Sequence, residues 1–314
     1  MNQKVAKIPI VFAFDENLIL PAAVCISSLL EHANENTYYD IYVLHPKGVN
    51  MQNSILSRIY EKYHDFNLSY IEVDAVFNNA YEVRGITNPT YYRLLIPNLL
   101  PNIDKIFYSD VDIVFRSDLS EVYKMDLGDD YLAATYDLGM ILSENGSNHI
   151  ASIGLKNRDK YLQAGFLLIN SKKMREDNLV DVFIKKAQNK YKYQDQDILN
   201  IVCENKFRLL PLMYNMTDYV FMFLNQKHKY FDEVSDIDIT EALGKGTLHY
   251  NGHKPWKKYS LNFDVWWEYY RNSPVFDERF YYEFFRKKMD LYDTLTLWKR
   301  IKILARYFIH GRLQ

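Results

Sequence analysis

Two spacings of apolar positions alternate along the chain from its N-terminus. Continuous apolar runs rich in β-branched and aromatic residues predict strands over 8–14, 39–45, 68–73, 105–109, 113–115, 131–136 and 162–170. Apolar residues three and four positions apart predict helices over 18–33, 51–64, 90–100, 173–190 and 195–204. This alternation is typical of an α/β fold with a mainly parallel central sheet.

Three carboxylates directly follow predicted strands, namely Asp15, Asp110 and Asp137. In a mainly parallel sheet the carboxyl ends of the strands face one edge, and ligands bind outside that edge. We therefore expect these side chains to lie close together, where the chain leaves the core and a charge can be placed at little cost.

Composition narrows the class of protein. The 314 residues are 48% hydrophobic, which suffices for one large domain with an appendage or for two small domains. The net charge of −2 gives no general attraction for nucleic acid. Cys25 and Cys203 lie in apolar stretches and are expected to be buried thiols. No secretory signal or spanning helix is recognisable, so the sequence predicts a cytoplasmic protein.

The pattern Asp-x-Asp occurs three times, at 110/112, 195/197 and 236/238. Solvated acids explain the third pair, and the dipole of a predicted helix explains much of the second. Asp110 and Asp112 are different because buried-strand sequence flanks them on both sides. Two carboxylates this close in a partly dry place repel each other unless a cation lies between them, and a divalent metal is such a cation.

The segment "LHYNGHKPW" (248–256) supplies the other groups that a metal–diphosphate complex needs. His249 can ligate a metal, Gly252 permits close approach of the backbone, and Lys254 can contact phosphate. His249 alone would more often be a core or loop histidine, so the interpretation depends on the combination. Mixed oxygen and nitrogen ligation beside phosphate suggests Mn²⁺ or Mg²⁺.

Seven short motifs follow one another in the order "IVFAFDEN", "TYYRLLIP", "FYSDVDIVF", "AATYD", "QAGFLLINSKKMR", "DQDIL" and "HYNGHKPW". Each is weak alone, but the ordered set resembles glycosyltransferase family 8 over about residues 8–256. This family includes bacterial lipooligosaccharide galactosyltransferases and glycogenin. The resemblance implies a Rossmann-like GT-A fold with a mainly parallel central sheet. It also implies a retaining, metal-dependent transfer of hexose from a UDP-sugar to a glycan, with Mn²⁺ or else Mg²⁺ as the metal and galactose slightly favoured over glucose.

Matched position by position, the resemblance implies roles for individual residues. The implied metal ligands are Asp110, Asp112 and His249. The implied catalytic or donor-sugar residues are Arg93, Asp137, Asp195 and Gln196. The implied substrate-binding residues are Ala13, Asp15 and Asn17 for uridine, Val111 near the ribose, Gln163, Ala164 and Gly165 beside the sugar, and Gly252 and Lys254 for the diphosphate.

Three positions differ from the usual family pattern. Leu18 stands where close relatives often have a tyrosine that stacks on uracil. Gln163 replaces the usual asparagine before "AG". Lys254 is one residue nearer to Gly252 than usual. Plainer interpretations also exist for three of the assigned residues, with Arg93 as a surface ion pair, Asp137 as a helix cap and Gln196 as a solvent-facing residue.

Two mechanisms and two other protein classes stay open at this point. Retention of configuration requires either attack from the leaving-group side, which we favour, or a nucleophile such as Asp195. Gln196 is a poor nucleophile because its amide is neutral. The alternatives to a transferase are an inactive UDP-sugar-binding module and a metal-dependent nucleotidyltransferase or phosphatase.

The C-terminal part has a different composition. We assign 1–264 to the glycosyltransferase domain and 265–314 to a helical extension. Residues 286–314 hold eight Lys or Arg against two Asp. Their apolar residues recur at helical spacing, at Leu291, Leu295, Trp298, Ile301, Leu304, Tyr307 and Phe308. This pattern fits either a helix packed on the domain or one lying on an anionic membrane. In the second case the protein would be peripheral at the inner face of the membrane.

Overall fold

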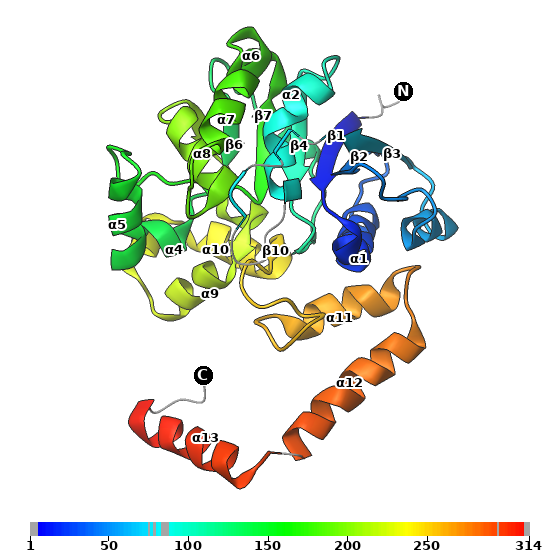
Figure 1. Ribbon diagram of the computed structural model, residues 1–314, viewed down its shortest axis with the longest axis vertical. Coiled ribbons are helices and arrows are strands. Elements are labelled where there is room, and N and C mark those ends of the chain that lie inside the picture. The colour runs from blue at the N-terminus through cyan, green and yellow to red at the C-terminus, as the bar shows by residue number, and fades with distance from the viewer. Residues whose placement is uncertain (1–5, 75, 78–79, 83–87, 294, 311–314) are drawn as a thin grey trace. The chain divides into compact units, whose positions relative to one another are not determined.

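The computed structural model describes residues 6–74, 76–77, 80–82, 88–293 and 295–310 (Figure 1). The chain divides into two compact units, Met1–Val275 and Phe276–Gln314. The first unit contains every described strand. The assignment of 1–264 and 265–314 as domains stays a prediction.

A seven-stranded sheet forms the centre of the first unit (Figure 1). Its order is β3 (Phe66–Val73), β2 (Thr37–Pro46), β1 (Ala6–Ala13), β4 (Lys105–Ser109), β7 (Phe166–Asn170), β6 (Leu132–Ala134) and β8 (Phe207–Leu209). Neighbouring strands are parallel except at β7, which runs antiparallel to both β4 and β6. The predicted α/β class and mainly parallel sheet are confirmed, and β1, β4 and β6 end at the same edge.

A second, three-stranded sheet adjoins that edge. It consists of β5 (Ile113–Val114), β10 (Leu248–His249) and β9 (Met216–Thr217), with β10 in the middle. In the antiparallel pair of β10 and β5, His249 lies opposite Ile113. This pairing brings His249 beside the end of the Asp110–Asp112 segment, although the two are far apart in sequence.

Several predicted helices differ in type or length from the structure. In place of the helix predicted over 51–64, the structure has the 3-10 helix η2 (Ile55–Glu61). In place of the helix predicted over 90–100, it has the 3-10 helix η3 (Asn88–Leu95) followed by α2 (Ile96–Leu99). Pro97 lacks the N–H that would continue an α-helix from η3. The prediction for 173–190 is split into α6 (Ser171–Glu176) and α7 (Leu179–Ala187), because Asn178 adopts a left-handed conformation with φ of 54°.

The predictions for 18–33 and 195–204 are confirmed as α1 (Ile19–Glu31), preceded by η1 (Glu16–Leu18), and α8 (Gln194–Val202). The predicted strand 162–170 is shorter, because 162–165 form a loop at the sheet edge. The remaining described helices of the first unit are α3 (Ser120–Tyr123), α4 (Leu138–Ile141), α5 (Glu144–Ser152), η4 (Leu212–Tyr214), α9 (Asp218–Asn225), η5 (Lys229–Glu233), α10 (Asp236–Lys245) and α11 (Phe263–Asn272).

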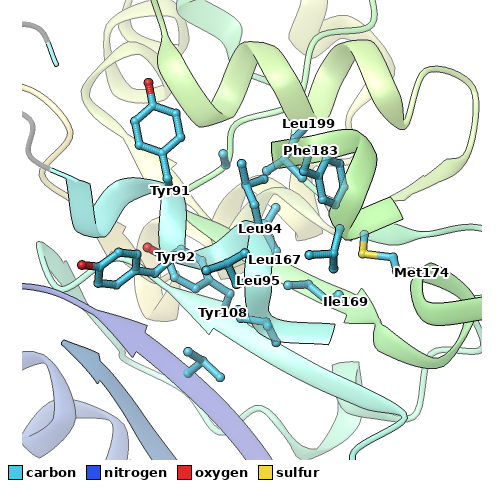
Figure 2. Close-up of a cluster of buried hydrophobic side chains, with 14 of the residues drawn as sticks. Tyr91, Tyr92, Leu94, Leu95, Tyr108, Leu167, Ile169, Met174, Phe183 and Leu199 are labelled. Carbon is cyan, nitrogen blue, oxygen red and sulfur yellow. The ribbon is translucent and has the colours of Figure 1, made fainter. Parts of the chain in front are cut away.

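One face of the large sheet carries an apolar core shared with η3, α2, α6, α7 and α8 (Figure 2). Tyr92 and Leu94 of η3 are buried there with Tyr108 of β4 and Leu167 of β7. Burial of these large side chains is the main force that holds η3 against the sheet. It also fixes the backbone around Arg93 at the sheet edge. The two cysteines are free and buried, as predicted.

The second unit contains α12 (Glu278–Asp293) and α13 (Leu297–His310). The helical structure predicted for the C-terminal part is therefore confirmed. Among the apolar residues at helical spacing, Leu291 and Tyr307 have side chains that are not among those described. Large apolar side chains of α13 are exposed, including Trp298 at 78% and Phe308 at 80%. Within the described part of the chain, no helix combines the length and the apolar character that crossing a membrane requires.

Candidate active site

A cavity of about 1540 Å³ opens in the first unit at the carboxyl edge of β1, β4 and β6. Asp15, Asp110 and Asp137 line it together, as their positions after strands predicted. Every other residue to which the resemblance gave a role lines it too, namely Ala13, Asn17, Arg93, Val111, Asp112, Gln163, Ala164, Gly165, Asp195, Gln196, His249, Gly252 and Lys254.

Asp110, Asp112 and His249 form a cluster whose ligand atoms all lie within 4.8 Å of one another. The Nε2 atom of His249 lies 3.4 Å from Oδ1 of Asp112 and 3.8 Å from Oδ2 of Asp110. Two carboxylates and one imidazole that converge on one point suit a divalent ion that accepts oxygen and nitrogen ligands. The residues present therefore fit the metal that the sequence implied.

Asp112 carries its negative charge in a mostly buried position. Burial alone would raise the pKa of its carboxyl, but Lys254 and His249 outweigh that effect and hold the pKa well below its usual range. Lys254 forms an ion pair with Asp112 and donates to the carbonyl oxygen of Tyr250 at 2.6 Å. The cavity thus already holds one cation against this carboxylate.

Arg93 connects the candidate metal site with a third carboxylate. Its Nη2 donates to Oδ1 of Asp110 at 2.8 Å, and its Nε lies 3.0 Å from Oδ2 of Asp195. The hydroxyl of Tyr108 also donates to Oδ1 of Asp110, at 2.8 Å. Arg93 is buried, so it is a bridge between two site carboxylates and not a surface ion pair.

Asp195 is buried at the start of α8. Burial raises the pKa of its carboxyl to about 6, although the positive charge of Arg93 acts in the opposite direction. The hydroxyl of Thr90 donates to its Oδ1 at 2.6 Å. Both oxygens of Asp195 therefore have a partner from η3.

Gln196 is half-buried in the wall of the cavity, and both ends of its amide are held. Its Nε2 donates to Oδ2 of Asp137 at 3.0 Å, and its Oε1 accepts from the backbone N–H of Ala164 at 3.0 Å. Asp137 also caps α4 by accepting from the N–H of Met140 at 3.1 Å. It is thus a helix cap and a cavity residue at once, and burial raises the pKa of its carboxyl.

Asp197, Asp236 and Asp238, the other acids of the Asp-x-Asp pairs, do not line the cavity. Asp197 is fully buried, accepts from the N–H of Tyr193 at 2.9 Å and lies 2.9 Å from Nε2 of His149. Asp236 and Asp238 are exposed in the first turn of α10, as expected for solvated acids.

Two residues near the site were missed by sequence reasoning. Asn215 lies behind His249, with its Oδ1 2.9 Å from the imidazole Nδ1. Asp218, at the start of α9, lies against Gly252, where an added Cβ would be only 2.6 Å from its Oδ2. Neither residue belongs to one of the seven motifs. Only the three-dimensional pairing of β9 with β10 brings them to the site.

Comparison with known sequences decides the family. The sequence model of the family described as glycosyl transferase family 8 matches residues 9–260 of this chain. The chain belongs to glycosyltransferase family 8. The resemblance seen in the ordered motifs is thereby confirmed.

Relatives of this chain include bacterial glycosyltransferases. A Haemophilus influenzae protein with a provisional glycosyltransferase name is 30% identical over 66% of this chain and 63% of its own length. The chain thus spans less than two thirds of that relative. The lipopolysaccharide 1,2-glucosyltransferase of Escherichia coli is 26% identical over 83% of this chain and 76% of its own length.

Solved structures show the same fold. The bifunctional glycosyltransferase WbbM has a TM-score of 0.71 and 27% identity, covering 90% of this chain and 52% of WbbM. The galactosyltransferase LgtC has a TM-score of 0.71 and 23% identity, covering 87% of this chain and 98% of LgtC. The predicted GT-A fold is confirmed by these similarities.

Proposed function

We propose that this protein is a retaining, metal-dependent glycosyltransferase that moves a hexose from a UDP-sugar to a glycan. The observation that carries the proposal is the convergence of Asp110, Asp112 and His249 in one cavity with Lys254. The acceptor would be part of a bacterial surface polysaccharide, lipooligosaccharide or glycoprotein, in line with the names of the relatives. Galactose is slightly favoured over glucose as the sugar.

The diphosphate would bind beside the metal site. Asp110, Asp112 and His249 would hold Mn²⁺, or else Mg²⁺, which when bound supplies positive charge to stabilise the leaving diphosphate. Lys254 can add a second positive charge by moving from Asp112 to a phosphate oxygen. Gly252 leaves room for the phosphates because it has no side chain.

The nucleoside would lie at the end of β1. Ala13, Asp15 and Asn17 would contact the uridine, and Val111 would lie near the ribose. Leu18 lines the same part of the cavity, where close relatives often have a tyrosine. An apolar side chain still covers the base but cannot stack on it as an aromatic ring does.

The donor sugar would lie between η3, α8 and the loop 163–165. Asp195 makes a poor nucleophile because Arg93 and Thr90 occupy its oxygens, and Gln196 is neutral and held at both ends. These contacts favour attack from the leaving-group side. The acceptor hydroxyl oxygen then bonds to the anomeric carbon, the bond from that carbon to the phosphate oxygen breaks, and the hydroxyl proton passes to the departing phosphate.

Residues 286–314 would bring the enzyme to the membrane that carries the acceptor. The described part of α13 combines exposed Trp298 and Phe308 with Lys299, Arg300, Lys302 and Arg306. Aromatic and basic side chains on one helix suit the interface of an anionic bilayer. We therefore propose a cytoplasmic enzyme that is peripheral at the inner face of the membrane.

Assay of the purified protein with UDP-galactose and UDP-glucose tests the proposal. We expect slow release of UDP and free sugar without an acceptor, faster UDP release with an acceptor glycan, and an α-linked product by NMR spectroscopy. Release of UMP and sugar phosphate would instead indicate a nucleotidyltransferase or phosphatase. Binding of UDP-sugar without any turnover would indicate an inactive binding module.

A further inference from the structure

A row of buried hydrogen bonds leads from the loop 163–165 to the imidazole of His249. The backbone N–H of Gly165 donates to Oε1 of Gln163 at 2.6 Å. Asn215 Nδ2 donates to the same Oε1 at 2.8 Å. Asn215 Oδ1 lies 2.9 Å from Nδ1 of His249. Gln163, Asn215 and His249 are all buried.

The direction of every bond in this row follows from its first member. A backbone N–H can only donate, so the atom of Gln163 that faces Gly165 must be the amide oxygen. The group of Asn215 that faces this oxygen must then be its NH₂, which leaves the Asn215 oxygen toward His249. The imidazole Nδ1 must therefore carry a proton. In the neutral ring the lone pair is then on Nε2, the atom that faces Asp110 and Asp112.

The space around the row is full. A Cβ on Gly165 would lie 2.4 Å from Cε1 of His249 and 2.8 Å from Oδ2 of Asp110. The carbonyl of Gly165 also accepts from the backbone N–H of Asp110 at 2.8 Å. The loop 163–165 thus touches two of the three candidate metal ligands at once, and only glycine fits at its end.

We propose that Gln163 and Asn215 are positioning residues that hold the His249 imidazole in the tautomer and orientation needed to ligate the metal. The inference rests on the proposed metal site and extends it to two residues outside the ligand set. It also gives a reason for glutamine at 163. Its carbonyl oxygen is engaged by Gly165 and Asn215, and only its NH₂ is left to reach a sugar.

The affinity for Mn²⁺ tests this directly, measured from the spin-resonance signal of free Mn²⁺ with the full chain and no UDP-sugar. We expect Gln163→Leu and Asn215→Leu to weaken Mn²⁺ binding by roughly 10- to 100-fold, as loss of a partner behind a metal-bound histidine does. Gln163→Glu keeps an oxygen acceptor for Gly165 and Asn215, so it should bind Mn²⁺ far more tightly than Gln163→Leu.

A matched control separates this effect from simple repacking. Thr247 is fully buried just before β10, and its hydroxyl has no hydrogen-bond partner among the described residues. Thr247→Val should therefore leave the Mn²⁺ affinity unchanged. Far-ultraviolet circular dichroism checks that each variant is folded, and the Gln163 pair still decides the question if Asn215→Leu does not fold.

A double-mutant cycle shows whether the effect passes through His249. In a His249→Ala background, Asn215→Leu should weaken Mn²⁺ binding no further. An equal loss in both backgrounds would overturn the inference, as would wild-type affinity in both leucine variants. A changed ratio of UDP-galactose to UDP-glucose hydrolysis in Gln163→Leu with unchanged Mn²⁺ affinity would make Gln163 a sugar contact instead. If the wild-type protein binds no Mn²⁺, the proposed metal site itself fails.

Discussion

At the scale of single residues, the positive charge of Arg93 compensates two carboxylates of the site. Its guanidinium lies between the partly buried carboxylate of Asp110 and the buried carboxylate of Asp195, which would otherwise repel each other in a poorly solvated place. Removing one partner from such a buried network typically costs about 3–5 kcal/mol, because the remaining charges stay uncompensated. The sequence could name Arg93 only through its motif, since its two acidic partners come from distant segments.

Asp195 should make the stability of the protein depend on pH. Burial raises the pKa of its carboxyl from 3.8 to about 6. Between these values the folded protein binds more protons than the unfolded chain, so the free energy of unfolding falls as the pH rises through this window. As the pH rises from 4 to 7, we expect the free energy of unfolding to fall less in Asp195→Asn than in the wild type. This difference between the two proteins should be roughly 3 kcal/mol at most. Urea unfolding at both pH values measures this, and identical pH dependence in the two proteins would refute it.

At the scale of elements, the strands were easier to predict than the helices. A strand buried on both faces gives a continuous apolar run, and β1, β2 and β4 were recognised in this way. An apolar spacing of three and four residues does not separate an α-helix from the 3-10 helices η2 and η3. No residue pattern in the sequence indicated which distant strands pair, so the position of Asn215 behind His249 could not be inferred from it.

In the loop after β10, Gly252 lies directly against the carboxylate of Asp218. A Cβ there would lie 2.6 Å from Oδ2 of Asp218, so either this carboxylate or the loop that carries Lys254 would have to shift. We expect Gly252→Ala to lower UDP release about tenfold or more, since small displacements of groups that position a substrate are costly. The same substitution should cost less in an Asp218→Ala background, because the clash is then relieved. An equal cost in both backgrounds would show that the contact with Asp218 is not the cause.

At the scale of the whole molecule, the residues proposed for catalysis and those proposed for membrane contact lie in different units of the chain. Every residue with a proposed catalytic or binding role lies in the unit Met1–Val275, and the exposed apolar and basic side chains of α13 lie in Phe276–Gln314. From the change in composition, the sequence predicted a division into 1–264 and 265–314, and these bounds stay a prediction. It could not fix where the first unit ends, because α11 continues the aromatic, helical character of the tail.

Removal of α13 should therefore separate two activities. A protein ending at Thr296 should lose salt-sensitive binding to anionic vesicles and keep UDP-sugar hydrolysis, since each basic residue near such a surface contributes on the order of 1 kcal/mol, screened by salt. Co-sedimentation with anionic and with neutral vesicles measures the first activity, and UDP release measures the second. A shortened protein that unfolds or stops hydrolysing the donor would mean that α13 stabilises the catalytic unit instead.

The most direct test of the proposed chemistry is the metal dependence of UDP release from the preferred UDP-sugar. Wild-type protein should release UDP with Mn²⁺ and stop when EDTA removes it. With Mn²⁺ present, Asp112→Asn should release UDP about 100-fold more slowly or worse, because a dominant electrostatic group is lost. Asp236→Asn, which removes the same charge from an exposed Asp-x-Asp pair on α10, should match the wild type. Undiminished release in EDTA, or equal rates for the two variants, would contradict a metal-dependent transferase.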